Sequence, residues 1–262
     1  RSWMPIFGNR VNIQSSLDEI TISPSFFAPF VNVDADKKHR DPDYNIFNYP
    51  IESLSEDKNN YVPFKINNEL IKKLLIDTLP TTVILGLPEE LGKGTLIQGP
   101  LVTPILKKMM FKSDNFLAEQ LLINAQRVQG YETQKTYLTY LKSSLFASLP
   151  DPLIWVDGSG LSVYNMNTPR NLVKALEIIF HMITWDEIIE LFPNKFADGN
   201  NDNSFVYAKT GTLRHNQALS GYLITQSGRK LAFSFMSNHY TVPPSQIRAE
   251  IEKILLHIRD AY

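Results

Sequence analysis

Short runs of alternating apolar and polar residues dominate the N-terminal quarter of the chain, and this pattern predicts β-strands. Val11 and Ile13 alternate with polar neighbours, and Ile20 and Ile22 do the same a few residues later. The polar turn between the two runs indicates a hairpin. The charged stretch from Asp34 to Asp43 is expected to form a solvated loop.

In the middle of the chain, apolar positions recur every three or four residues, which predicts amphipathic helices. Asn68 is expected to cap the first helix, and Pro104 fits the first residue of the second. Thr168 and Pro169 mark another helix start, with the threonine as cap. Two further helices are expected, one from Phe116 and one over residues 133–149.

Strand patterns return towards the C-terminus. Residues 205–213 alternate loosely, and residues 219–225 and 230–237 flank a polar turn, which predicts a hairpin. A final helix is expected from Pro243-Pro244, because the residues that follow form one apolar stripe. That stripe consists of Ile247, Ile251, Ile254, Leu255 and Ile258.

Composition narrows the class of protein. The 262 residues include 26 basic and 27 acidic side chains and no cysteine. This near-neutral balance argues against a nucleic-acid partner, and the lack of cysteine excludes disulfides, thiol catalysis and Cys-ligated metal sites. No apolar run approaches the roughly 18–20 residues of a transmembrane helix, so none is expected.

The sequence contains no recognisable motif for metal binding or nucleotide binding. The five histidines lack the spacing of an H-E-x-x-H metal site. No G-x-G-x-x-G or Walker segment is present to bind a nucleotide. We therefore expect neither a metal nor a cofactor.

Three short segments carry candidate chemistry, although each has an ordinary structural explanation by itself. Ser113-Asp114-Asn115 lies between two expected helices, where Ser, Asp and Asn are common capping residues. Residues 209–212 (K-T-G-T) end an expected strand, where the glycine could simply allow a bulge. Residues 157–162 (D-G-S-G-L-S) could be a flexible connection.

In combination, these segments resemble one enzyme family. S-D-N and K-T-G, in this order, are motifs of serine β-lactamases and penicillin-binding proteins. With D-G-S-G-L-S, residues 112–119, 157–162 and 207–213 closely resemble the D-alanyl-D-alanine carboxypeptidase/endopeptidase branch of the low-molecular-mass penicillin-binding proteins. The resemblance begins near Asn67. It implies an α+β, β-lactamase/transpeptidase-like fold with an antiparallel sheet flanked by helices, incomplete at its N-terminal side.

The resemblance also implies a set of site residues. In such enzymes a serine attacks the carbonyl between two D-alanines and forms an acyl-enzyme that water hydrolyses. Ser113 would pass a proton towards the leaving amine, Asn115 would donate its amide to a substrate carbonyl, and Lys209 would hold Ser113 and attract the terminal carboxylate. The expected substrate-binding residues are Asp114, Asp157, Ser159, Thr210, Gly211 and Thr212, with the Thr212 N–H as an oxyanion donor.

The S-x-x-K motif, which supplies the attacking serine in this family, has no convincing match. Ser55-Glu56-Asp57-Lys58 lies in a charged stretch without an apolar face, and Ser227-Gly228-Arg229-Lys230 follows K-T-G in a hairpin turn. Both are interpreted as chance matches. We expect the nucleophile upstream of Arg1, residues 1–66 as the tail of an inserted domain, and residues 67–262 as the C-terminal part of the penicillin-binding domain.

The resemblance implies a peptidoglycan stem peptide as substrate, β-lactam antibiotics as inhibitors, and export to the periplasm or cell envelope. A non-catalytic peptidoglycan-binding homologue that lost its nucleophile is the alternative. A β-lactamase is a second rival, which D-G-S-G-L-S disfavours because that run belongs to the carboxypeptidase branch. No deacylating glutamate loop is recognisable either.

The sequence departs from the family pattern in three places. Val163 follows D-G-S-G-L-S where relatives commonly carry arginine. The Asn-rich segment between Pro193 and Phe205 is shorter than its counterpart in many relatives, so one wall of the cleft is expected to differ. Arg214 and His215 place charge near the site, and an exposed strand end is their simplest explanation.

Overall fold

The computed structural model describes residues 4–16, 19–33, 36, 38–41, 43–50, 52, 59–86, 98–197 and 204–262. The chain divides into two compact units, residues 1–98 and 99–262. This division differs from the boundary expected between residues 66 and 67, because Leu70 and Leu74 are buried in the core of the first unit. The assignment of residues 1–66 to the tail of an inserted domain stays a prediction.

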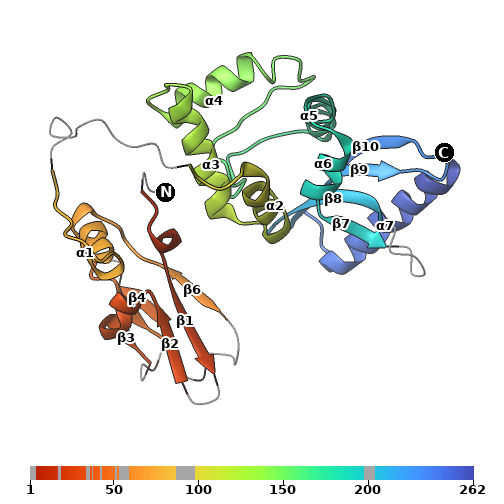
Figure 1. The fold of residues 1–262 in the computed structure, drawn as a ribbon. Helices are drawn as coiled ribbons and strands as arrows, with labels where there is room; N and C mark the ends of the chain where they lie inside the picture. The colour runs from red at the N-terminus through yellow and green to blue at the C-terminus, as the bar shows by residue number, and fades with distance from the viewer. Residues whose placement is uncertain are drawn as a thin grey trace. The chain divides into compact units, whose positions relative to one another are not determined.

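The described part of the first unit contains two three-stranded sheets, one α-helix and two 3-10 helices (Figure 1). The expected hairpin is present, as β1 pairs antiparallel with β2 and, on its other side, with β6. The second sheet has the order β3-β5-β4, so part of the expected loop at 34–43 is the strand β4. The elements are η1 (Phe7–Asn9), β1 (Arg10–Ser16), β2 (Glu19–Ser23), η2 (Ser25–Phe30), β3 (Val31–Asn32), β4 (His39–Asp41), β5 (Ile46–Asn48), β6 (Asn60–Pro63) and α1 (Asn68–Thr78).

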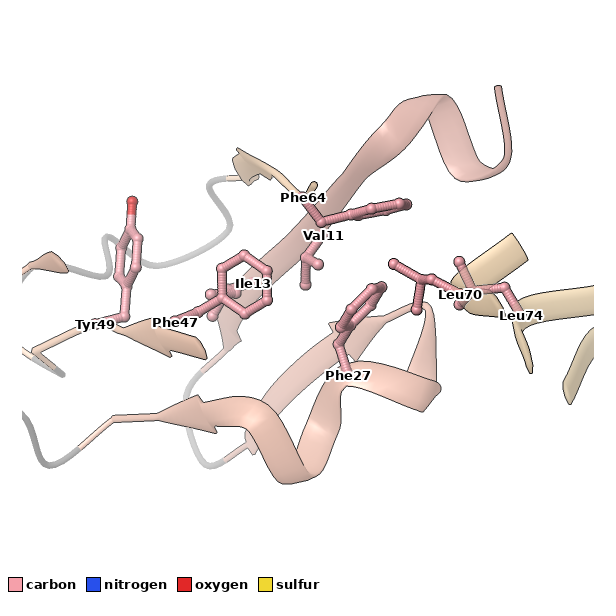
Figure 2. Close-up of a cluster of buried hydrophobic side chains, with 8 residues drawn as sticks. All are labelled: Val11, Ile13, Phe27, Phe47, Tyr49, Phe64, Leu70 and Leu74. Carbon is pink, nitrogen blue, oxygen red and sulfur yellow. The ribbon is translucent and has the colours of Figure 1, made fainter. Parts of the chain in front are cut away.

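Aromatic rings make up half of the buried core residues of the first unit. Phe27 lies at its centre and contacts the rings of Phe47 and Phe64, with centroid distances of 5.7 and 4.9 Å. Figure 2 shows these rings with Val11, Ile13 and Tyr49, and with two leucines from α1. Asn67, and not Asn68 as expected, caps α1, because its side chain accepts the Leu70 N–H at 2.8 Å.

The second unit is a four-stranded sheet with helices on both faces, in the order β10-β9-β8-β7. All three pairings are antiparallel, and the hairpin expected at 219–237 is present as β9 and β10. This confirms the α+β class with an antiparallel sheet flanked by helices. The strands are β7 (Asn194–Ala197), β8 (Ser204–Leu213), β9 (Asn216–Ile224) and β10 (Lys230–Asn238).

Side-chain alternation gives each face of this sheet its own core. On one face, Leu219 and Leu223 pack with Ile251 and Leu255 of α7 (Pro244–Ala261). On the other face, Tyr222 packs with α5 (Pro169–Met182) and α6 (Trp185–Leu191), and its hydroxyl donates to the Leu176 carbonyl at 2.7 Å. In Figure 1, α7 runs along one side of the strands and α5 and α6 lie on the other.

Three more helices, α2 (Val102–Lys112), α3 (Asn115–Val128) and α4 (Gln134–Ser143), complete the second unit. Helix α2 begins two residues before Pro104, and α4 is shorter than expected because Ser144 has left the helical conformation. Thr168 caps α5 as expected, whereas α6 and β7 were not predicted. Within the described ranges, no helix is both long enough and apolar enough to cross a bilayer.

Candidate active site

The S-D-N segment forms a sharp turn between two helices. Helix α2 ends at Lys112, and the backbone of the next residue, Ser113, is left-handed (φ 48°, ψ 48°). This conformation costs a non-glycine residue about 1–2 kcal/mol, so the surrounding structure must hold it. Asp114 caps α3 by accepting the Leu117 N–H at 3.1 Å, and Asn115 is the first residue of that helix. The turn therefore leaves the Ser113 and Asn115 side chains exposed at the helix junction.

Lys209 of β8 reaches across to this turn. Its Nζ donates a hydrogen bond to Ser113 Oγ and a second one, at 2.8 Å, to the Thr210 carbonyl. Burial lowers the pKa of Lys209 below its usual value, and the charge of Lys195 lowers it further. Among the described side chains, no carboxylate forms an ion pair with Lys209. The ammonium group is thus available to an anion that enters from outside.

The strand that carries Lys209 has an open edge along its second half. Strand β7 pairs with β8 only as far as Tyr207, and the last bond on that side runs from the Ala208 N–H to Pro193 O at 2.9 Å. Backbone groups alternate along a strand, so the N–H groups of Thr210 and Thr212 point to the same side as that of Ala208. No described strand covers that side beyond Ala208.

The loop 157–162 faces this edge and is held by internal hydrogen bonds. The buried Asp157 carboxylate accepts the N–H groups of Gly160 and Ser162 at 2.6 and 2.7 Å, and the Asn165 amide at 3.1 Å. The loop is also fixed to α3, where Glu119 Oε1 accepts the Ser159 N–H at 3.2 Å. These contacts make the loop a preformed wall.

One cleft of about 820 Å³ brings most of the expected residues together. Its lining includes Ser113, Asp114, Asn115, Ser159, Lys209, Thr210, Gly211 and Thr212. Asp157 is not part of the lining, because its carboxylate is directed into its own loop. The cleft therefore offers a cation, hydroxyl and amide groups, and an open strand edge within a single concave site.

Several residues that line the cleft or support its wall were missed by sequence reasoning. Glu119 lies in the quoted segment 112–119 but received no role, although its spacing of four residues from Asn115 predicts the same helix face. Asn165 and the methionines of the cleft carry no motif signal at all. Their positions depend on the packing of the loop against the helices, which single-sequence patterns do not reveal.

The other candidates lie away from this chemistry. Ser227 hydrogen-bonds with Thr225 at 3.0 Å and contacts the Tyr262 carbonyl, and it does not line the cleft. Ser55-Glu56-Asp57-Lys58 lies outside the described residues. Arg214 and His215 form the exposed turn between β8 and β9. Within the described part of the chain, no group of three or more His, Cys, Asp or Glu residues could hold a metal ion.

Comparison with known proteins links the second unit to one family. The family model described as the D-Ala-D-Ala carboxypeptidase 3 (S13) family matches residues 97–257. The chain is 28% identical over 194 residues to D-alanyl-D-alanine carboxypeptidase DacB of Haemophilus influenzae, covering 67% of this chain and 40% of that protein. It is 28% identical over 222 residues to carboxypeptidase DacB of Mycolicibacterium smegmatis, covering 72% and 48%. The chain thus spans less than half the length of these relatives.

The fold is similar to that of a solved relative. Penicillin binding protein 4 (dacB) from Haemophilus influenzae aligns with a TM-score of 0.56 and 23% identity, covering 90% of this chain and 61% of that one. This similarity supports the transpeptidase-like fold expected from the motifs.

Proposed function

Because the chain belongs to the D-Ala-D-Ala carboxypeptidase 3 (S13) family, we propose that its cleft binds the D-Ala-D-Ala end of a peptidoglycan stem peptide in a serine-type hydrolase. One observation carries this proposal: the contact between Lys209 Nζ and Ser113 Oγ joins the K-T-G strand to the S-D-N turn beside an open strand edge. Both segments belong to unit 99–262, as does every residue of the cleft.

In this proposal the peptide binds as an additional strand. Its terminal carboxylate lies against Lys209, with Thr210 as a further hydrogen-bond donor. The peptide backbone pairs with the open edge of β8, where Gly211 has no side chain to obstruct it. Asn115 donates its amide to a substrate carbonyl. Asp157 and Ser159 act by shaping the opposite wall.

The proposed chemistry is acyl transfer to a serine followed by hydrolysis. A serine oxygen bonds to the carbonyl carbon between the D-alanines, and the Thr212 N–H stabilises the oxyanion. The C–N bond then breaks, and the proton that leaves the attacking serine hydroxyl reaches the departing amine of D-alanine through the Ser113 hydroxyl, which gives up one proton and receives the other. The oxygen of a water molecule then bonds to the acyl carbon, the ester C–O bond breaks, and a proton from the water restores the serine hydroxyl. Lys209 orients Ser113 throughout this sequence.

We do not assign the attacking serine to either S-x-x-K match in the chain. Ser227 lies outside the cleft, where its hydroxyl is engaged by Thr225 and the C-terminal residue. Ser55 lies in a stretch of charged residues with no apolar face to form a buried helix. In this proposal, the chain supplies the S-D-N and K-T-G side chains that bind the substrate and assist the attacking serine.

The names of two similar proteins support β-lactams as inhibitors. A relative in Dictyostelium discoideum that is 25% identical over 185 residues is described as penicillin-sensitive carboxypeptidase A. The Haemophilus influenzae penicillin binding protein 4 has been solved in complex with a β-lactam. We propose that this protein shares that sensitivity, and that it is exported to reach peptidoglycan.

The alternative is a homologue that binds peptidoglycan without cutting it. The peptide-binding groups of the cleft would serve a binder as well as an enzyme. Reading the open reading frame before the Arg1 codon distinguishes the two. An in-frame S-x-x-K segment behind a signal peptide supports the enzyme, and its absence supports the binder.

Calorimetry on this chain tests peptide binding. Nα,Nε-diacetyl-L-lysyl-D-alanyl-D-alanine is expected to bind, whereas the same peptide with a C-terminal amide should bind at least tenfold more weakly, because it lacks the carboxylate that pairs with Lys209. Equal affinities would overturn the proposed role of Lys209. A fluorescent penicillin should leave no labelled band for this chain on a denaturing gel, and a band would show that the nucleophile lies within it.

A further inference from the structure

Two histidines, His215 and His239, face each other at one end of the four-stranded sheet, and we propose that they bind a divalent transition-metal ion such as Zn²⁺. This inference does not depend on the proposed hydrolase function. Three observations carry it: the pairing of the two residues across the β9–β10 ladder, the backbone conformation that they share, and an unpartnered amide oxygen next to them in the ladder.

The two histidines are directly opposite each other in the ladder. The register of β9 and β10 ends with Asn216 opposite Asn238, and its next pair is His215 opposite His239. The His239 N–H donates to the His215 carbonyl at 2.7 Å, so the pairing continues to this point. Opposite residues of an antiparallel pair have Cβ atoms about 4.5–5.5 Å apart. Two imidazoles at that separation can bind a single ion, although their spacing in the sequence matches no metal-binding motif.

Both imidazole rings are free to turn towards an ion. His215 and His239 are exposed, and neither side chain has a hydrogen bond or an ion pair with a described residue. The turn between β8 and β9 is itself held in place, because the Asn216 side-chain amide donates to the Arg214 carbonyl at 2.9 Å. Metal binding would therefore order two side chains and leave the backbone as it is, which keeps its entropic cost low.

The backbone of both histidines is left-handed. The φ angle is 58° at His215 and 55° at His239, and no other described histidine has a positive φ. Residues other than glycine adopt this conformation infrequently. Backbone strain of this kind is concentrated at functional sites. Its presence at the two histidines that pair, and at no other described histidine, supports a function for the pair.

A buried acceptor lies two positions further along the same ladder. Gln217, which pairs with Ser237, is only 5% exposed, and its Oε1 atom has no hydrogen-bond partner among the described residues. A histidine that binds a metal usually donates its other ring N–H to an acceptor, and such outer contacts contribute to metal affinity. Gln217 Oε1 is suited to accept a hydrogen bond from His215 or from a water molecule on the ion.

The ligands favour an ion that prefers nitrogen. Imidazole suits zinc, copper and nickel, whereas calcium and magnesium prefer oxygen ligands. With two protein ligands, water fills the remaining positions, and the ion should bind more weakly than in a four-ligand structural zinc site. Arg214 carries the neighbouring positive charge, but its side chain is exposed and has no described partner that would hold it near the ion.

Calorimetry with zinc chloride tests this site in the whole chain. One ion per chain is expected to bind at about pH 7.5, and protonation of the imidazoles should abolish binding at about pH 5. His215→Ala and His239→Ala should each weaken binding at least tenfold. His181→Ala and His257→Ala are the matched controls, because each removes an exposed histidine from a helix, where no second histidine lies opposite. Both controls should bind Zn²⁺ as tightly as the parent chain.

Gln217→Leu tests the outer contact and should weaken Zn²⁺ binding about tenfold. Thermal unfolding of each variant without zinc shows whether a loss of binding is a loss of folding instead.

Three results would overturn the proposal: no binding of Zn²⁺ to the parent chain, equal binding to the parent chain and to both His215→Ala and His239→Ala, or a zinc-dependent dimer in light scattering. The dimer would mean that the ion joins histidines of two chains. None of these results would affect the proposed hydrolase function, because the two histidines have no role in it.

Discussion

The two walls of the cleft are built in different ways. The wall formed by β8 is regular. Residues 209–213 pair with β9 without interruption, and on the free edge an N–H and a C=O group recur at every second residue. The loop 157–162 has no such ladder, and it is held by carboxylates, with Asp157 inside the loop and Glu119 beneath it. One wall is therefore shaped by backbone pairing and the other by a few buried side chains.

The two walls are therefore suited to recognising different parts of a ligand. A strand edge recognises any peptide backbone, and Lys209 adds recognition of a carboxylate. A loop with outward-facing side chains distinguishes one substituent from another. Changes on the strand wall should therefore affect all ligands alike, whereas changes on the loop wall should affect ligands according to their side chains.

Replacing Lys209 tests the strand wall and should have the largest effect. Lys209→Met keeps most of the side-chain length but removes the cation that pairs with the carboxylate. Affinity for every D-Ala-D-Ala peptide should fall by about a hundredfold, in line with roughly 3 kcal/mol for a charge-assisted pair that is partly desolvated. Calorimetry measures the loss. A decrease that depends on the side chain before D-Ala-D-Ala would contradict the proposed difference between the two walls.

Adding a side chain at Gly211 should have the next largest effect. A Cβ at this position meets only the Ala218 Cβ at 3.7 Å, so Gly211→Val should fold normally. The branched side chain would lie where the peptide approaches the edge, and affinity should fall about tenfold or more. Unchanged thermal unfolding together with unchanged affinity would show that the peptide does not use this edge.

The loop wall is tested by Gly158→Ala. The added Cβ would be 2.7 Å from the Ala118 carbonyl oxygen, so the loop must move away from α3. Overpacking of this kind costs about 1–3 kcal/mol of unfolding free energy. Affinity for the diacetyl peptide should drop a few-fold, because the displaced loop no longer forms the same wall of the cleft. Gly160→Ala separates the two kinds of cost, because an added Cβ there meets no atom within 4 Å and its only cost is the left-handed backbone (φ 75°), about 1–2 kcal/mol.

The smallest expected effect is a pH dependence. The pKa of Lys209 is lowered in the folded chain, chiefly by burial, from its usual 10.5. Between the lowered pKa and 10.5, the unfolded chain binds more protons, so the unfolding free energy contributed by Lys209 rises with pH across that window. Denaturant titrations from pH 8 to 11 should show this rise in the parent chain and not in Lys209→Met. If the unfolding free energies of the parent chain and of Lys209→Met change with pH in the same way, Lys209 is not desolvated in the folded chain.

Much of the second unit follows from local sequence. The β9–β10 hairpin, the Thr168 cap of α5 and the apolar stripe of α7 are local patterns, and all three are present. The predictions are wrong where tertiary contacts determine the local structure. Asn67 caps α1 although Asn68 has the same chemistry, since only the geometry of the preceding chain separates neighbouring asparagines.

The sequence motifs of the site could be predicted, whereas the contacts between them and the orientation of their side chains could not. Ser113 and Lys209 are 96 positions apart, and only the family resemblance indicated that they meet. The inward orientation of Asp157 had no sequence signal, because an exposed aspartate and a loop-capping aspartate look alike in a turn. Val163 and Met166 were missed as cleft residues for a different reason, because they lie in an irregular segment without periodicity.

Amide hydrogen exchange along β8 tests the central claim most directly. In the free chain, the Thr210 and Thr212 N–H groups face the open edge and should exchange quickly, whereas those of Lys209 and Gly211 face β9 and should be protected. Saturation with Nα,Nε-diacetyl-L-lysyl-D-Ala-D-Ala should slow exchange at Thr212 and Thr210 and leave Gly211 unchanged. Binding that leaves the exchange of Thr210 and Thr212 as fast as before would contradict the account.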